Sequence, residues 1–93
     1  MKYTLLETNT YIKEKNKLNS KQLEKLAYVI EKLRNGEVLE RKYKDHKLKG
    51  DMEILRDCHI EPDLVLIYAK DKEKLILTAL RINTHSNLGL TGK

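Results

Sequence analysis

The sequence predicts an α+β domain in which two N-terminal helices pack on a twisted antiparallel sheet of about four strands. Three observations support this fold class. A short run of β-branched and aromatic residues opens the chain, apolar residues then recur at helical spacing between positions 20 and 35, and three apolar runs separated by short polar segments follow after position 50. Helices followed by a strand meander favour a sheet with its helices on one face.

Length and composition predict a single domain over residues 1–93. A chain of this size has room for one core layer and buries about 60–65% of its unfolded surface. Hydrophobic residues make up 40% and charged residues 35%, which is typical of compact soluble proteins. Because Cys58 is the one cysteine and there is no apolar leader or long apolar run, we expect no internal disulfide, no membrane segment and a cytoplasmic location.

The net charge of +5, from 19 Lys and Arg against 14 Asp and Glu, favours a polyanionic partner. Cationic side chains gain affinity by releasing the counterions condensed on phosphates. An acidic protein would suit the same surface, so the charge by itself does not distinguish nucleic acid from protein.

The chain begins with a predicted strand over residues 2–6, which has β-branched and aromatic content but little length. A first helix is predicted from Thr8 or Asn9 to Leu18. Either of the first two side chains can accept hydrogen bonds from the N–H groups of the first helical turn.

A second helix follows a break at Asn19 and Ser20, which supply its N-cap, and it ends at Asn35 and Gly36, where glycine suits the position after the C-cap. Its predicted core stripe has helical spacing: Leu23, Leu26, Ala27, Ile30 and Leu33. Two helices joined by a tight break predict an antiparallel pair laid on the sheet.

Residues 37–50 form a basic segment. Its cations surround Tyr43 and the pair Asp45 and His46: Arg41, Lys42, Lys44, Lys47 and Lys49. Basic side chains interleaved with an aromatic ring suit a nucleic-acid backbone and a stacked base. Taken alone, however, the segment is better interpreted as a solvent-exposed connector.

Three apolar runs then predict an antiparallel meander over 52–60, 64–69 and 75–82. Because strand side chains alternate between faces, Asp57 and His59 share one face. Pro62 supplies a turn that brings Asp63 back towards His59.

In the last strand the same alternation predicts one shared face, which His85 continues if the strand stays extended: Leu75, Leu77, Ala79, Arg81 and Asn83. We expect the helices to cover one face of the sheet. The other face would then be a concave, cationic surface that collects polar residues: Asp57, His59, Arg81, Asn83 and His85.

All three histidines, His46, His59 and His85, lie in polar or charged surroundings and outside apolar helical stripes. A buried core histidine fits this context poorly, whereas incidental surface histidines remain one interpretation. A metal site is disfavoured, because Cys58 and His59 face oppositely and no CxxC or HxxxH spacing is present. We therefore expect neither a metal nor another cofactor.

Two imidazoles and an arginine suit the cleavage of RNA without a metal. The 2′-OH is the substrate's own nucleophile, so the enzyme needs a base for its proton, an acid for the departing 5′ oxygen and cations for the charge on phosphorus. A nearby carboxylate can orient the imidazole base. The product would be a 2′,3′-cyclic phosphate, and DNA, which lacks the hydroxyl, would not be cut.

Four motifs in order resemble the YafQ-type toxins of bacterial type II toxin–antitoxin systems, within the RelE/ParE superfamily. They are YKDH at 43–46 with Leu48 and Gly50 after it, RDCHIEPD at 56–63, LIY at 66–68 and THSNL at 84–88. The resemblance implies a RelE-like fold and an mRNA interferase that cuts the message in the ribosomal A site. It also implies a cognate acidic antitoxin as partner, with DNA contacted only through the antitoxin complex.

By position, the resemblance assigns functional roles to His46, His59, Asp63 and His85, with Asp57 beside them. It implies that His85 is the general acid for the leaving oxygen. Either His46 or His59, steered by Asp63 or Asp57, would be the base.

Arg56 and Arg81 are candidates for holding the scissile phosphate, and an ion pair between Arg56 and a neighbouring acid is an equal alternative. The cations proposed to bind RNA beside them come from the basic segment: Lys44, Lys47 and Lys49.

Leu64 and Gly89 depart from the family pattern, because close relatives often carry aromatic residues at these places. Loss of stacking would weaken substrate placement by about 1–3 kcal/mol per base. Leu90 could partly substitute, and Tyr43 or Tyr68 could offer a stacking surface, although Tyr68 fits the core better.

Two other functions compete with the nuclease. One is a non-catalytic member of the same superfamily, either a gyrase-poisoning toxin or an inactive toxin that serves as an antitoxin-binding corepressor. The other is an RNA-binding accessory protein that leaves RNA uncut. The histidines distinguish these functions, because a gyrase poison has no evident use for them.

Overall fold

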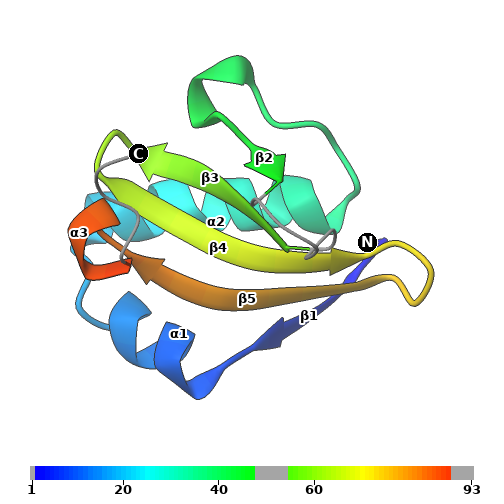
Figure 1. The fold of residues 1–93 in the computed structure, drawn as a ribbon, viewed down its shortest axis with the longest axis horizontal. Coiled ribbons are helices and arrows are strands. Elements are labelled where there is room, and N and C mark those ends of the chain that lie inside the picture. The colour runs from blue at the N-terminus through cyan, green and yellow to red at the C-terminus, as the bar shows by residue number, and fades with distance from the viewer. Residues whose placement is uncertain (1, 48–54, 89–93) are drawn as a thin grey trace.

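The computed structural model describes residues 2–47 and 55–88, and at His85 the backbone alone. The elements follow in the order β1 (Thr4–Glu7), α1 (Asn9–Lys15), α2 (Ser20–Arg34), the 3₁₀ turn η1 (Arg41–Tyr43), β2 (His46–Lys47), β3 (Leu55–Glu61), β4 (Leu64–Asp71), β5 (Ile76–Asn83) and α3 (His85–Leu88) (Figure 1). None of the helices in the described ranges is long and apolar enough to span a membrane.

Both N-terminal helices begin at the caps that the sequence predicts. The Thr8 hydroxyl accepts a hydrogen bond from the Tyr11 N–H at 3.0 Å and donates one to the Leu80 carbonyl at 2.8 Å, so the cap also ties α1 to β5. At α2, Asn19 Oδ1 accepts from the Gln22 N–H at 2.8 Å while Gln22 Oε1 accepts from the Asn19 N–H at 3.0 Å. This reciprocal capping box satisfies two N–H groups that the helix itself cannot pair.

The end of α2 confirms the predicted glycine stop. Gly36 has a φ of +76°, a left-handed conformation in which a glycine meets no Cβ penalty. Its N–H donates to the Leu33 carbonyl at 3.1 Å, and the next N–H, of Glu37, donates to the Lys32 carbonyl at 3.0 Å. These two bonds form a Schellman motif, which satisfies carbonyls left open at the helix end.

The five-stranded sheet has the order β1-β5-β4-β3-β2. The α+β class is confirmed, with two differences from the predicted sheet. First, β1 pairs parallel to β5, whereas the other pairs of strands are antiparallel, so the sheet is mixed. The helices after β1 return the chain to the end of the sheet where β1 began, which allows the parallel pairing. Second, part of the segment expected to be a connector forms the short strand β2, which pairs antiparallel to β3 and adds a fifth strand.

The core lies between α2 and one face of the sheet, and in Figure 1 α2 runs behind the strands while α1 lies beside β5. Cys58, Leu66 and Ile82 are cross-strand neighbours on β3, β4 and β5, and at most 1% of each is exposed. The predicted stripe of α2 is corrected in part: Val29 is buried, whereas Leu23 is 38% exposed.

A bulge in β5 changes the predicted alternation of its side chains. Tyr68 on β4 pairs with Ala79, but the preceding residue, Ile67, pairs with Arg81, so Leu80 is an extra residue in the ladder. A bulge of this kind shifts the residues beyond it to the opposite face. Ala79 and Ile82 therefore both face the core, and the predicted shared face of Ala79 and Arg81 is wrong.

Candidate active site

The strand register brings the predicted polar residues together on the sheet face opposite α2, which we call the open face. One row across the strands contains His46, Asp57, Ile67 and Arg81. The next row contains His59, Val65 and Asn83. Cross-strand partners and residues two apart on one strand share a face, so β2, β3 and β5 all contribute to one surface.

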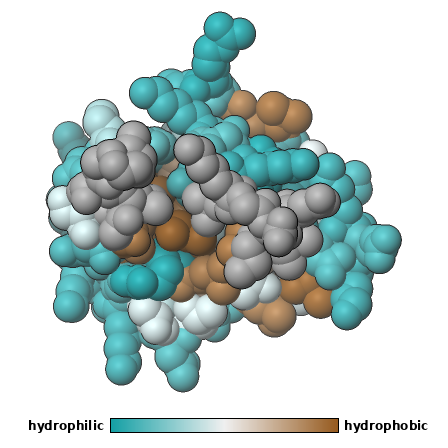
Figure 2. Space-filling model, in the orientation of Figure 1, coloured by the Kyte–Doolittle hydropathy of each residue, from teal (hydrophilic) through white to brown (hydrophobic). Residues whose placement is uncertain are grey.

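Hydrophilic residues cover most of the visible surface on this side of the molecule, and smaller apolar areas lie among them (Figure 2). Val65, which separates His59 from Asn83 in the second row, is fully buried. These two polar side chains therefore flank a buried apolar position of the sheet.

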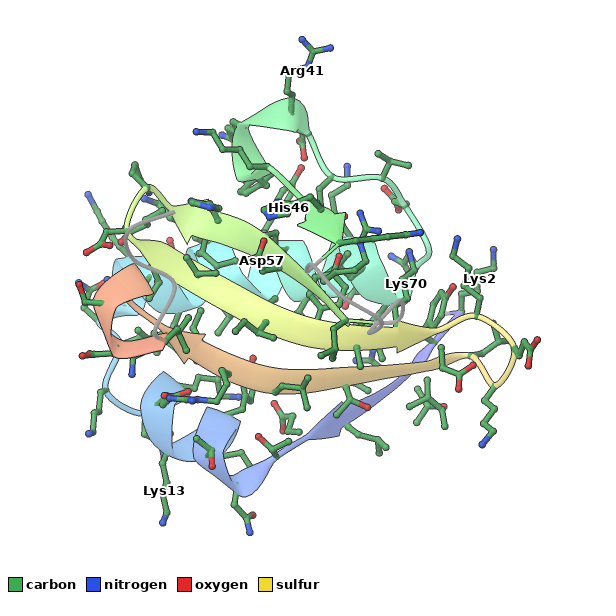
Figure 3. All side chains as sticks on the ribbon, in the orientation of Figure 1. Lys2, Lys13, Arg41, His46, Asp57 and Lys70 are labelled. Carbon is green, nitrogen blue, oxygen red and sulfur yellow. The ribbon has the colours of Figure 1, made fainter. Side chains whose placement is uncertain are left out.

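His46 and Asp57 lie side by side on neighbouring strands (Figure 3), with His46 Nε2 2.9 Å from Asp57 Oδ1. The other ring nitrogen, Nδ1, lies 2.7 Å from the Lys44 carbonyl oxygen. The contact with the Lys44 carbonyl meets hydrogen-bond geometry, whereas the contact between Nε2 and Asp57 Oδ1 is a close charge contact. Asp57 is 4% exposed, and a buried carboxylate of this kind requires such a charged or hydrogen-bonding partner.

His59 is half-buried on β3, near the hairpin that joins this strand to β4. Pro62 and Asp63 form the two-residue turn, and Glu61 pairs with Leu64 across it. His59 pairs with Val65 across the hairpin, and Asp63 precedes Val65 by two residues in the chain. The turn predicted from Pro62 is thus confirmed, while the steering of His59 by Asp63 stays a prediction.

Arg81 is held by Glu14 of α1. Its Nε lies 3.0 Å from each Glu14 carboxylate oxygen, and its Nη2 lies 2.5 Å from Oε2. The same carboxylate accepts from the Ile82 N–H and from Asn83 Nδ2, both at 2.9 Å. Burial alone would raise the pKa of Glu14, but these hydrogen bonds outweigh it and hold the pKa below its ordinary value.

Arg56 lies on the core side of β3, across the sheet from the histidines. It pairs with Tyr68 in the ladder, and its Nε lies 3.2 Å from Asp45 Oδ1. The Tyr68 hydroxyl donates to the same oxygen at 2.5 Å. The sequence makes Arg56 a candidate either for holding the scissile phosphate or for an ion pair with a neighbouring acid, and the structure shows the ion pair, with Asp45.

The remaining predicted residues lie in different places. Lys44 follows η1 with a φ of +50°, and Lys47 is exposed on β2. The backbone of His85 starts α3 two residues beyond Asn83, at the end of β5. Lys49 and the His85 side chain lie outside the described part of the chain.

The aromatic positions give a further correction. Tyr43 is 8% exposed and its ring packs against Tyr28 with centroids 6.1 Å apart, so only a small part of the ring is open to a base. Tyr68 is fully buried, as expected. Leu64 is 5% exposed, and Gly89 and Leu90 lie outside the described residues.

Glu14 is the site residue that sequence reasoning missed. It lies within a helix rich in charged residues, where neither spacing nor motif distinguishes it from a solvated carboxylate. Its partners follow 67 to 69 residues later. Only the packing of α1 beside β5 reveals this contact.

Comparison with known proteins gives a consistent family match. A family model described as the bacterial toxin YafQ of type II toxin–antitoxin systems matches residues 3–90. The mRNA interferase toxin YafQ of Escherichia coli strain K12 is 44% identical over 69 residues, which cover 73% of each chain. The putative toxin YafQ of Haemophilus influenzae is 41% identical over 68 residues, which cover 71% of this chain and 67% of that protein.

Solved structures agree with the sequence matches. YafQ in the DinJ–YafQ toxin–antitoxin complex of E. coli has a TM-score of 0.79 and 33% identity, covering 99% of this chain and 100% of that one. A metal-bound toxin from Helicobacter pylori has a TM-score of 0.80 and 34% identity, and the match covers 92% of this chain and 98% of that one. Within residues 2–47 and 55–88 of the present chain, no group of three or more His, Cys, Asp or Glu side chains is placed to hold a metal ion.

Proposed function

Because this chain belongs to the YafQ family of bacterial toxins of type II toxin–antitoxin systems, we propose that it is an endoribonuclease that cleaves mRNA. Curated relatives are named mRNA interferase toxins. The observation that carries the proposal is the convergence of His46, Asp57, His59 and Arg81 on the open face of a protein with a net charge of +5.

The proposed reaction is transfer of the phosphoryl group within the RNA. A general base takes the proton of the 2′-OH, the 2′ oxygen attacks phosphorus, and the bond between phosphorus and the 5′ oxygen breaks. A general acid gives a proton to that departing oxygen. The products are a 2′,3′-cyclic phosphate and a 5′-hydroxyl end, and nearby cations stabilise the charge that develops on the phosphoryl oxygens.

The position of His46 favours one assignment of the base. His46 Nε2 lies 2.9 Å from Asp57 Oδ1 and Nδ1 lies 2.7 Å from the Lys44 carbonyl oxygen. Because both of its ring nitrogens are engaged within the protein, His46 suits a positioning role, with Asp57 holding it in place. We therefore assign the base to His59, steered by Asp63. The family resemblance assigns the acid to His85.

Arg81 is proposed to bind the scissile phosphate. Glu14 engages the Nε and Nη2 edge of its guanidinium, and the opposite edge carries further N–H donors. A guanidinium fixed on one edge is pre-oriented for a phosphate on the other.

Two partners follow from the same proposal. The first is mRNA in the ribosomal A site. The second is a cognate antitoxin, as in the DinJ–YafQ toxin–antitoxin complex of E. coli, and we expect it to be acidic. The charge of +5 supports both, because a complementary surface speeds association. We further propose that the protein acts in the cytoplasm and meets DNA only through its antitoxin complex.

The test is growth arrest on expression, followed by mapping of the cut messages by primer extension. The acid variant His85→Ala should relieve the arrest, since a positioned acid or base contributes about 10²–10⁴-fold to rate. Lys13→Ala, an exposed change on α1, should leave it intact. Cyclic phosphate ends that persist in the presence of a chelator would support the mechanism, whereas arrest that survives loss of all three histidines would refute it.

A further inference from the structure

A cavity of about 400 Å³ opens beside His59, between η1 and the β3–β4 turn. Its cationic side chains come from three segments: Lys25 of α2, Lys42 of η1 and Lys44 just after it. His59 and Lys44 already have roles in the proposed reaction and in RNA binding, but neither role accounts for the cavity itself or for Lys42 and Pro62 in its wall.

The walls of the cavity combine two chemistries. Tyr43, Ile60 and Pro62 contribute apolar surface, and the lysines contribute positive charge. The volume lies within the range of about 300–1,000 Å³ typical of small-ligand sites, which pair an apolar lining with a few polar groups. An apolar wall with cationic groups around it suits a nucleotide, whose base is flat and apolar on its faces and whose phosphate is anionic.

The charge balance leaves the cavity cationic. Glu61 also lines it, but its carboxylate accepts from Gln22 at 3.1 Å and pairs with Lys25 at 3.0 Å. For Lys42 and Lys44, no carboxylate of the described residues lies within ion-pair distance. The Lys42 ammonium instead sits 5.3 Å from the centroid of the Tyr43 ring, where a base and its phosphate would meet both groups.

The cavity is joined to the candidate active site at two points. His59 lines its wall, and the Lys44 carbonyl lies 2.7 Å from His46 Nδ1. RNA lying across the two histidines would therefore extend directly into it. We propose that this cavity binds the nucleotide that flanks the scissile phosphate, with its base against Tyr43 and Pro62 and its phosphate at Lys42 and Lys44. This inference rests on the proposed function.

An acidic protein segment would also satisfy the lysines, but its charge alone gives no reason for an apolar wall directly beside His59. The position of His59 also favours RNA, because the cavity then continues the path of the substrate. A nucleotide subsite explains the charge, the apolar wall and the location together.

The experiment titrates ¹⁵N-labelled protein with adenosine 3′,5′-bisphosphate and follows the backbone amide shifts. The amides of Lys42, Lys44 and Ile60 should move, while adenosine or inorganic phosphate alone should bind at least about tenfold more weakly, since each supplies only half of the contacts. Lys42→Ala and Lys44→Asn should each weaken binding by about tenfold. Asparagine is chosen at position 44 because it tolerates a positive φ.

The matched control is Lys13→Ala, which removes an exposed lysine on α1, far from Arg41 and η1 (Figure 3). It should bind the bisphosphate as the wild type does, and equal thermal unfolding midpoints would show that all variants are folded.

Three results would overturn the inference: no bisphosphate binding, shifts confined to another surface, or equal losses in the pocket and control variants. Shifts of the same amides by an acidic hexapeptide, and not by the bisphosphate, would also overturn it and identify a protein-docking site instead. Failure of the proposed function is distinguishable, because a protein that binds the bisphosphate but never cuts RNA retains the subsite and loses only the nuclease.

Discussion

Glu14 and Arg81 form a two-point ion pair that links α1 to the end of β5, with Arg81 Nε 3.0 Å from both carboxylate oxygens. The Glu14 carboxylate also accepts from the Ile82 N–H and from Asn83. Asn83 in turn accepts from the Thr84 N–H and from Asn87 of α3. One carboxylate therefore organises the segment that leads into His85.

Removing this charge should loosen the segment. Glu14→Gln keeps the shape of the side chain but leaves Arg81 without its anionic partner. Because the Glu14 side chain is only 11% exposed, we expect a loss of about 1–3 kcal/mol in the free energy of unfolding. RNA cleavage should fall by up to about 100-fold with little change in RNA affinity, since the reacting groups are misplaced rather than lost. Urea unfolding and single-turnover cleavage measure the two effects.

Glu24→Gln, at an exposed position of α2, is the matched control and should change neither quantity. If Glu14→Gln weakened RNA binding and left the single-turnover rate unchanged, Glu14 would not be a positioning residue for cleavage.

The lowered pKa of Glu14 predicts a specific acid sensitivity. A carboxylate whose folded-state pKa lies below its unfolded value stabilises the fold above the unfolded pKa of about 4.5, and this stabilisation disappears as pH falls through the folded value. The difference in unfolding free energy between wild type and Glu14→Gln should therefore be constant near neutral pH and shrink below pH of about 4.5. A difference independent of pH would exclude the charge as its cause.

Local rules were sufficient for much of the fold. The caps at Thr8 and Asn19 and the stop at Gly36 depend on side chains within a few residues, so the sequence displays them directly. The shared face of Asp57 and His59 follows from strand alternation, which no bulge interrupts between these two residues.

Other features depend on contacts that a local pattern does not contain. The bulge at Leu80 moves Arg81 and Asn83 to the open face, although simple alternation groups them with buried Ala79. The short β2 strand forms because Asp45 meets Arg56 and Tyr68 on the core side while His46 meets Asp57 on the open face. Such pairings join segments that only the folded chain brings together.

The contact between His46 and Asp57 predicts that this carboxylate sets the position of the imidazole. His46 Nε2 lies 2.9 Å from Asp57 Oδ1, and Nδ1 lies 2.7 Å from the Lys44 carbonyl oxygen. Asp57→Asn keeps the shape of the side chain but removes its charge, so the ring resonances of His46 should shift and RNA cleavage should fall. Ring resonances that stay unchanged in Asp57→Asn would show that Asp57 does not position His46.

Tyr68 and Tyr28 offer a comparison of the same bond in two environments. Each hydroxyl donates to a carboxylate at 2.5 Å, Tyr68 to Asp45 in the core and Tyr28 to Glu40 at the surface. Burial, together with the hydrogen bond to Asp45, raises the pKa of Tyr68 well above its ordinary value, so the phenol remains a donor at neutral pH.

Replacing each tyrosine by phenylalanine should therefore have unequal effects. Tyr68→Phe leaves a partly buried Asp45 oxygen with one donor fewer, and we expect a loss of about 1–2 kcal/mol in the free energy of unfolding. Tyr28→Phe should cost less than about 0.5 kcal/mol, because water replaces an exposed donor. Because Asp45 immediately precedes His46, Tyr68→Phe should also perturb the His46 ring resonances. If the two substitutions lowered the free energy of unfolding equally, the contact between Tyr68 and Asp45 would not anchor β2.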